Sequence, residues 1–241
     1  MSLLSDPYKP KYIQLFERLK QDILTGNLKS GDKIYSENEL RKIYNVSSTT
    51  VRKAIDTLRN SGLITRIQGV GTFVKEHHVQ RSLEKILSFT KNMIQAGLKP
   101  STKVLEKKII KATGTYAEKL GVKSGEKIFL LRRLRFGNET PMLLETRYIT
   151  LKLCPDIIDM DLTGSLYDIY EKKYGVKLFR AEQHLQIAFL NEKEAKLLKC
   201  EVGAPCFFVT GVTYSDNSEP VEYEESLYRG DEYEFFVKVG G

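Results

Sequence analysis

The stretch from residue 36 to residue 74 constrains the fold of this 241-residue chain most strongly, because helix signals, turn signals and apolar spacings agree along it. Ser36 is followed three residues later by Glu39, a spacing in which each side chain can accept a hydrogen bond from a backbone N–H that a helix start leaves unpaired. Asn45 is typical of a helix end in left-handed geometry. Ser47 then predicts the cap of a second helix.

The second predicted helix has one apolar and one polar face. Val51, Ala54, Ile55 and Leu58 recur at the i, i+3, i+4, i+7 spacing of a buried face, and Gly62 predicts the helix end. The opposite face carries Ser48, Thr49, Arg52, Lys53, Asp56 and Arg59. Short polar residues followed by long cations are typical of a helix that enters the DNA major groove, because its first residues meet base edges and its cations meet phosphates or guanines.

A β-hairpin is predicted next, with strands at residues 63–67 and 72–74 and a tip at 68–71 that contains two glycines. The glycines let the backbone approach a phosphate or a minor groove, and Arg66 and Lys75 place positive charge nearby. The alternative is a small helical domain with an incidental hairpin. Two capped helices, a polar face and a hairpin in succession favour DNA binding.

These residues resemble the winged helix of the GntR superfamily of bacterial transcription regulators. The resemblance is carried by Ser36-Glu37, Glu39-Leu40, Val46-Ser47, Thr50 to Ile55, Leu58, Gly62 to Ile64, Gly69 and Gly71 to Val74. It implies that Arg52 and the wing tip at Gly69 contact DNA. The family often has arginines where this chain has Asn38 and Ser48. The predicted DNA-contacting set is Ser36, Asn38, Ser48, Thr49, Thr50, Arg52, Lys53, Arg66 and Gly69.

Charge is concentrated in the same part of the chain. The first 78 residues have 13 Lys and Arg against 8 Asp and Glu, whereas the whole chain has 38 against 31. A polyanion would therefore be attracted mainly to the N-terminal segment. The three cysteines have no metal-ligand spacing, no signal peptide is visible, and no apolar run approaches the roughly 20 residues of a membrane helix. We expect a cytoplasmic protein without a membrane segment.

The chain divides into a predicted DNA-binding domain at residues 1–75, a charged linker at 76–82 and a second domain at 83–241. An apolar stripe from Tyr12 to Ile23 predicts a first helix that ends near Gly26 and packs behind the other two. The linker contains His77 and His78, which as neighbours cannot easily converge on one metal ion. We therefore predict no metal site and no cofactor.

The second domain is predicted to be α+β, built on a mostly antiparallel sheet. Turns at Gly137-Asn138 and Asp216-Asn217 join adjacent strands as hairpins. The expected strands cover residues 104–110, 128–136, 142–149, 185–189, 206–214, 221–228 and 234–239, and the expected helices cover 89–96, 115–120, 166–174 and 192–198. A helix and hairpin around 115–145 recur around 192–224. Repetition predicts a pseudo-symmetric sheet with a pocket between its halves, and chance similarity of two hairpins is the alternative.

Two arginines on one largely covered strand face indicate a site for a negative charge. Arg133 and Arg135 alternate in phase with Phe129 and Leu131, and a buried guanidinium needs an anionic partner. Internal carboxylates such as Glu145 and Glu222 can supply it, or a ligand phosphate or carboxylate can. Ser165 precedes a predicted helix, whose free N–H groups also attract anions.

The second domain resembles the UTRA effector domain of the HutC subfamily, whose fold is similar to that of chorismate lyase. The resemblance rests on Arg133-x-Arg135, Gly164 to Tyr167 and the tail from Glu219 to Phe235. In sugar-phosphate-responsive members, it implies phosphate contacts from Arg133, Arg135, Ser165 and Tyr167 with Ser88 or Thr90 nearby, and sugar contacts from Glu145, Glu222 and Tyr228. The tail has Glu232 and Glu234 where basic residues are usual.

We interpret the chain as a DNA-binding regulator, most simply a homodimeric repressor that a sugar phosphate controls. The alternatives are a non-phosphorylated acid as effector, a lyase-like enzyme fused to a DNA-binding domain, and an architectural DNA protein. An enzyme is disfavoured because His184 is the sole histidine after residue 82 and no Cys-His or Ser-His-Asp set stands out. An architectural protein would leave the second domain without a role.

Overall fold

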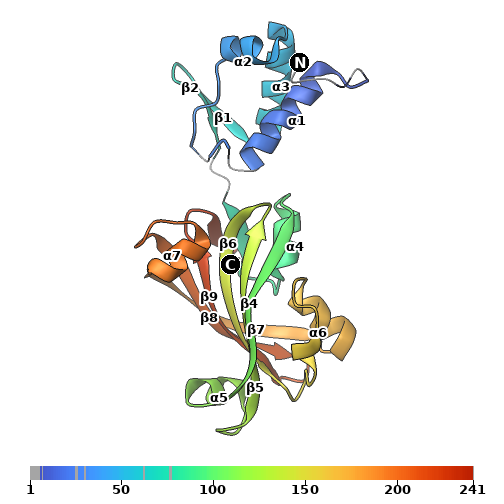
Figure 1. Ribbon diagram of the computed structural model, residues 1–241, viewed down its shortest axis with the longest axis vertical. Coiled ribbons are helices and arrows are strands. Elements are labelled where there is room, and N and C mark those ends of the chain that lie inside the picture. Colours follow the sequence, from blue (N-terminus) through green and yellow to red (C-terminus); the bar gives the residue numbers. More distant parts are fainter. Residues whose placement is uncertain are drawn as a thin grey trace. The chain divides into compact units, whose positions relative to one another are not determined.

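The computed structural model describes residues 6, 8–24, 27–29, 31–61, 63–75 and 78–240. The chain divides into two compact units, Met1–His77 and His78–Gly241, and each is described by itself (Figure 1). No helix among the described residues is long and apolar enough to cross a membrane. Both predicted classes of unit are present, a helical unit with a β-hairpin and an α+β unit.

The first unit packs three helices against a two-stranded hairpin (Figure 1). Its elements are α1 (Lys11–Leu24), α2 (Glu37–Tyr44), α3 (Ser48–Asn60), β1 (Ile64–Ile67) and β2 (Gly71–Val74). Leu15, Leu40, Val51, Ala54 and Leu58 have no exposed surface and form the centre of its core. The apolar stripe predicted for the second helix therefore faces the core.

Helix caps set the boundaries of α2 and α3 as the sequence predicts. The Ser36 hydroxyl accepts a hydrogen bond from the Glu39 N–H, and the Glu39 carboxylate accepts one from the Ser36 N–H at 2.7 Å. Asn45 ends α2 with a φ of 50°. Ser47 caps α3 by accepting from the Thr50 N–H at 3.2 Å, and Ser61 follows its last turn. Gly26 and Gly62, which were predicted to end helices, lie outside the described residues.

The second unit is built on a six-stranded antiparallel sheet with the order β4-β5-β6-β9-β8-β7. The strands are β4 (Pro100–Lys111), β5 (Lys127–Gly137), β6 (Thr140–Thr150), β7 (Leu178–Phe189), β8 (Pro205–Ser215) and β9 (Pro220–Arg229). The helices are α4 (Phe89–Gln95), α5 (Thr115–Leu120), α6 (Leu166–Tyr174) and α7 (Glu192–Leu198), with a short 3-10 turn at Ile157–Asp159. β7 begins seven residues before the predicted strand.

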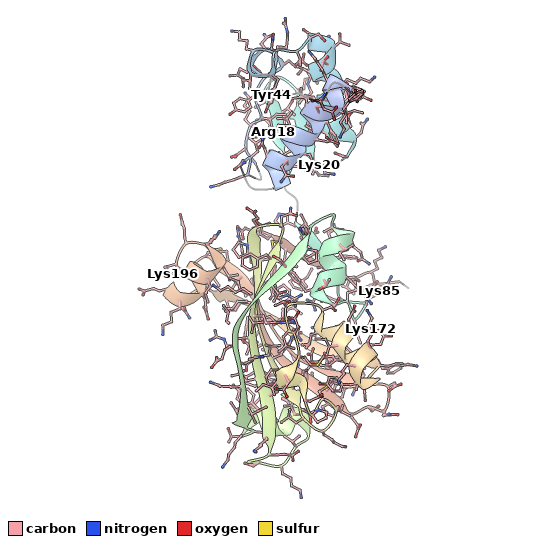
Figure 2. The ribbon with its side chains drawn as sticks, turned by 45° about the vertical axis from the view of Figure 1, so that its right-hand side comes forward. Arg18, Lys20, Tyr44, Lys85, Lys172 and Lys196 are labelled. Atoms are coloured by element: carbon pink, nitrogen blue, oxygen red, sulfur yellow. The ribbon has the colours of Figure 1, made fainter. Side chains whose placement is uncertain are left out.

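The helices cover both faces of this sheet. α4 and α6 pack on the face that carries Phe129, Leu143 and Ile149, whereas α5 and α7 pack on the face that carries Leu130 and Leu144. Figure 2 shows the labelled Lys172 of α6 and Lys196 of α7 on opposite sides of the sheet. Successive side chains of a strand point to opposite faces of the sheet, so the position of a residue in its strand determines which helices its side chain contacts.

The predicted internal repeat is visible in the strand order. β4, α5, β5 and β6 form one half, and β7, α7, β8 and β9 form the other, with β6 and β9 paired at the centre. Each half thus runs from an outer strand through a helix to a hairpin whose last strand is central. The same order in both halves argues against chance similarity of two hairpins.

The predicted linker is wrong over most of its length. β3 (Val79–Ser82) pairs in parallel with β10 (Tyr233–Phe236), so residues 79–82 belong to the second unit. Val79 and Arg81 are buried in this ladder, while Gln80 is exposed. The sequence did not reveal this strand, because residues 79–82 are few and largely polar and their partner strand lies about 150 residues away.

Candidate functional site

A pocket lies on the face of the sheet that α4 and α6 cover. It is lined by Arg81, Leu87, Ser88, Phe89, Arg133, Arg135, Glu145, Arg147, Ser165, Leu166, Tyr167 and Tyr228. Its free volume is about 10 Å³, which is roughly the room of a single water molecule. A larger ligand would therefore require the lining side chains to move.

The sheet register brings the first charged pair of this pocket together. Arg133 and Arg135 are 1% and 2% exposed and point to the same face as Phe129. Glu145 lies directly opposite Arg133 in the β5–β6 ladder. The Arg133 Nε donates to Glu145 Oε2 at 2.7 Å, and its Nη1 donates to the Leu162 carbonyl at 3.0 Å. Arg133 is thus neutralised by an internal carboxylate.

Arg135 is paired less completely. Its Nη1 lies 3.3 Å from the same Glu145 oxygen, and its Nη2 donates to the Thr90 hydroxyl at 3.2 Å. Its Nε is buried without a hydrogen-bond partner among the described residues, and its guanidinium lies over the Phe89 ring at 4.5 Å. Burial lowers the pKa of Arg135 to about 10. This arginine therefore stays charged at neutral pH with its charge incompletely compensated.

Arg147 extends the network across the central strands. It contacts Glu145 at 3.1 Å, Glu222 at 2.7 Å and Glu224 at 2.8 Å. Sequence reasoning missed Arg147 and Glu224, although charges at alternating positions of two apolar strands were a usable signal. Among the described residues, this buried cluster contains four arginines, of which Arg81 is one, and three carboxylates. It therefore has one excess positive charge.

Glu222 lies behind Arg147 and outside the pocket lining. It is fully buried, accepts from the Tyr170 hydroxyl at 2.7 Å and lies 3.4 Å from the Thr213 hydroxyl. Burial raises its pKa. The predicted sugar contact at Glu222 would therefore need a change in the ion pairs, and as it stands this carboxylate holds Arg147 in place.

Two hydroxyls in the lining are helix caps. Ser165 accepts from the Asp168 N–H at the start of α6, and Ser88 accepts from the Lys91 N–H at the start of α4, each at 3.2 Å. Tyr167 and Tyr228 complete the polar lining. Seven of the nine predicted effector residues line the pocket, Thr90 contacts it through Arg135, and Glu222 lies behind it.

Arg81 was not predicted at all. It donates a hydrogen bond to the Tyr228 hydroxyl and lies over the rings of Tyr228 and Phe235 at 4.9 Å and 5.9 Å. No sequence signal would have found it, because β3 becomes a strand only by pairing with the distant β10.

In the first unit, the predicted DNA-contacting residues lie on α2, α3 and the hairpin. Asn38, Thr49, Arg52, Lys53, Arg66 and Gly69 are exposed. The Arg52 Nε donates to the Glu37 carboxylate at 2.9 Å, and the Lys53 ammonium lies 4.4 Å from the centre of the Tyr12 ring. Gly69 has a φ of 77°, which favours glycine at the hairpin tip.

The described residues contain no cluster of three or more His, Cys, Asp or Glu that could hold a metal ion. His77, half of the histidine pair considered from sequence, lies outside them. The three cysteines are free thiols, and burial raises the pKa of Cys206 to about 11. This thiol is therefore protonated at neutral pH and a poor nucleophile.

Comparisons with known proteins agree with this arrangement. Residues 11–74 match the model of bacterial regulatory proteins of the gntR family, and residues 95–234 match the UTRA domain. The chain is 32% identical to the HTH-type transcriptional repressor NagR of Bacillus subtilis over 94% of this chain and 93% of that protein.

A second relative is the probable fructoselysine utilization operon transcriptional repressor of Escherichia coli K12, which is 31% identical over 91% of this chain and 90% of its own length. The crystal structure of PhnF from Mycobacterium smegmatis is similar with a TM-score of 0.70 and 25% identity, over 93% of this chain and 99% of that one. Both curated relatives are named as transcriptional repressors. The chain therefore belongs to the GntR family of bacterial transcription regulators, with a winged helix-turn-helix unit followed by a UTRA domain.

Proposed function

We propose that this regulator is a repressor whose operator affinity is changed by a sugar phosphate bound in the pocket of the second unit. The observation that carries the proposal is the buried guanidinium of Arg135. Its Nε has no hydrogen-bond partner among the described residues, and its contact with the shared Glu145 carboxylate is 3.3 Å long. A phosphate offers several acceptor oxygens, and arginine binds it through a planar donor fork. The excess positive charge of the cluster supports an anion of this kind.

The names of the relatives support the repressor role and the ligand class. Both curated relatives are called repressors, and one is named for utilization of fructoselysine, a sugar derivative. Ser88 and Ser165 supply hydroxyls in the pocket lining, and the Thr90 hydroxyl next to the pocket accepts a hydrogen bond from Arg135. We propose that Arg133, Arg135, Ser165 and Tyr167 hold the phosphate and that Glu145 and Tyr228 hold sugar hydroxyls.

We further propose a homodimer in the cytoplasm that places two winged helices on a palindromic operator. The spacing of half-sites must match the spacing of the two heads, so a small change in the second unit weakens operator binding. Coupling of this kind is typically about 1–3 kcal/mol, or roughly 5- to 150-fold in affinity. The DNA contacts we propose are the nine residues named from sequence.

The test is the thermal stability of the purified protein against hexosamine 6-phosphates, disaccharide phosphates, urocanate and inorganic phosphate. A ligand at about 100 times its Kd stabilises by roughly 2.7 kcal/mol, which should raise the midpoint by about 5–10 °C. A shift with one sugar phosphate alone supports the proposal. If urocanate or another unphosphorylated acid shifts the midpoint and no phosphate does, the phosphate assignment is wrong.

Two variants separate ligand recognition from folding. Arg135→Gln should abolish the shift with the sugar phosphate, because it removes the incompletely paired guanidinium. Arg132→Gln is the matched control, because Arg132 is on the same strand, faces the other side of the sheet and is partly exposed. The control should respond like the unchanged protein.

A further inference from the structure

Arg81 combines burial with a lack of ion pairs. The residue is 9% exposed, and its only hydrogen bond to a described side chain goes to the Tyr228 hydroxyl. The other three buried arginines of the pocket, Arg133, Arg135 and Arg147, each have a carboxylate within 4.0 Å. Within the described part of the chain, Arg81 has no such partner.

A buried guanidinium in this situation retains capacity to bind an acceptor. Arginine has five N–H donors, and burying a charge without pairing it is costly. The rings of Tyr228 and Phe235 offset part of that cost through their π faces. Because Arg81 lines the pocket, an acceptor group of a ligand that enters the pocket can take its remaining donors.

The position of Arg81 in the chain gives this contact a second consequence. Arg81 lies in β3, and the first unit ends at His77, four residues earlier. β3 is held by a parallel ladder in which Arg81 pairs with Phe235 of β10. The strand that leads out of the DNA-binding unit therefore carries a pocket residue.

We propose that Arg81 is an effector-binding residue and that β3 transmits occupancy of the pocket to the DNA-binding unit. The inference rests on the proposed function in that the pocket must bind an anionic effector. A ligand oxygen accepts from the Arg81 guanidinium in place of, or together with, the Tyr228 hydroxyl. The resulting shift of Arg81 on the Tyr228 and Phe235 rings moves β3 against β10.

The experiment compares the full chain with Arg81→Gln and Arg81→Lys. Binding of a hexosamine 6-phosphate and of inorganic phosphate is measured by calorimetry. Affinity for an operator selected from a random DNA library is measured without ligand and with saturating ligand. The matched control is Arg180→Gln, because Arg180 lies over the Tyr214 ring at 4.1 Å but is outside the pocket lining.

Arg81→Gln should weaken ligand binding at least tenfold and should reduce the effect of saturating ligand on operator affinity to less than twofold. Its operator affinity without ligand is the reference against which this effect is measured. Arg81→Lys keeps the charge without the planar fork and should retain part of the affinity. Arg180→Gln should match the unchanged protein in all three measurements.

Hydrogen exchange supplies a readout that does not depend on DNA. Ligand should change exchange of the β3 amides in the unchanged protein and in Arg180→Gln, but not in Arg81→Gln. If Arg81→Gln binds ligand with unchanged affinity, Arg81 is not a contact and the inference is wrong. If it binds weakly but still releases operator fully at saturation, transmission through β3 is wrong.

Failure of the proposed function looks different from failure of this inference. If the unchanged protein binds neither the sugar phosphate nor phosphate, the anionic effector is wrong and the inference falls with it. If the unchanged protein binds and responds, only the Arg81 variants decide the inference. Circular dichroism of Arg81→Gln excludes unfolding as the cause, and Arg81→Lys repeats the test with the charge retained.

Discussion

Arg52 of α3 donates to Glu37 of α2 at 2.9 Å, although the Arg52 side chain is 69% exposed. Exposed ion pairs stabilise by only about 0.2–1 kcal/mol, because solvent screens them. The pair therefore contributes little to folding. Its effect is to restrict the guanidinium, the group predicted to read a base, to one side of α3.

We predict that Arg52→Ala weakens binding to the preferred operator by about 1–3 kcal/mol, because a base contact is lost. Ligand binding in the second unit should not change. The measurement is a DNA titration by fluorescence anisotropy with an operator selected from a random library. Arg18→Ala is the matched control, since Arg18 is exposed and pairs with Asp22 of its own helix, α1, at 3.3 Å. Equal losses in both variants would contradict a specific role for Arg52.

Glu37→Gln should relax discrimination rather than abolish binding. The substitution frees Arg52 and removes a negative charge near the DNA, so affinity for random DNA should rise while the preference for the selected operator falls several-fold. Competition between operator and random duplexes at two salt concentrations checks this. An unchanged preference would show that Glu37 does not orient Arg52.

Glu145 is the carboxylate on which the buried arginines converge, with Arg133, Arg135 and Arg147 all within 3.3 Å. Glu145→Gln should reduce the free energy of unfolding by about 3–5 kcal/mol, because it leaves buried cations without their anion. Urea unfolding of the ligand-free protein measures this. The control is Glu219→Gln, which breaks an exposed pair with Lys152 and should cost less than about 1 kcal/mol.

Stability should also depend on pH through Glu145. Burial raises the pKa of this carboxyl, but the charges of Arg133, Arg147 and Arg135 outweigh burial and hold it well below the ordinary value. A folded-state pKa below the unfolded value, about 4.3, stabilises the protein above that pH. This stabilisation is lost as the pH falls below about 4.3 toward the folded-state pKa.

Unfolding experiments from pH 7 to pH 3 test that direction. The unchanged protein and Glu219→Gln should lose stability steeply below about pH 4.5, whereas Glu145→Gln, already destabilised, should lose less over the same range. Glu222 opposes the trend, because burial raises its pKa and favours its protonated form in the folded state. Parallel pH curves for the two variants would rule out Glu145 as the source.

The first unit was predictable from sequence because its signals are local. Caps at Ser36 and Ser47, the left-handed Asn45 and the apolar spacing of α3 all act within a few residues. The bounds of α5, α6 and α7 also match the predicted ranges, and α5 and α6 end at glycines in left-handed geometry. The residues that set the bounds of these helices lie in the helices or next to them.

The pocket was predictable only in part. Arg133 and Arg135 stand out because cations in an apolar strand need a partner, and the same reasoning pointed to Glu145. Ser165 was found from its place at a helix start, and the family resemblance added Ser88, Tyr167 and Tyr228. Arg81 was missed because its strand depends on pairing with β10. Sequence also could not predict which carboxylate pairs with which arginine. Only the strand register places Glu145 opposite Arg133, and Glu222 instead pairs with Arg147.

Gly211 allows β7 and β8 to lie close together, and this close pairing supports the ion pair between Glu224 and Arg147. A Cβ at Gly211 would collide with the Glu182 carbonyl oxygen and lie 3.0 Å from the Gln183 Cα, so β7 and β8 pair closely only because residue 211 has no side chain. This approach lets the Gln183 amide donate to Glu224, which in turn holds Arg147.

We predict that Gly211→Ala lowers the unfolding free energy by about 1–3 kcal/mol, because the added methyl group separates the two strands. The thermal midpoint should fall by roughly 2–4 °C per kcal/mol. Gly164→Ala is the control, since a Cβ there meets no atom within 4 Å and its backbone is not left-handed. Ligand binding is compared in the same two variants. If it weakens in Gly211→Ala and is normal in Gly164→Ala, the distance between β7 and β8 affects the pocket through Glu224 and Arg147. Equal midpoints for the two variants would show that β7, an edge strand, moves aside without cost.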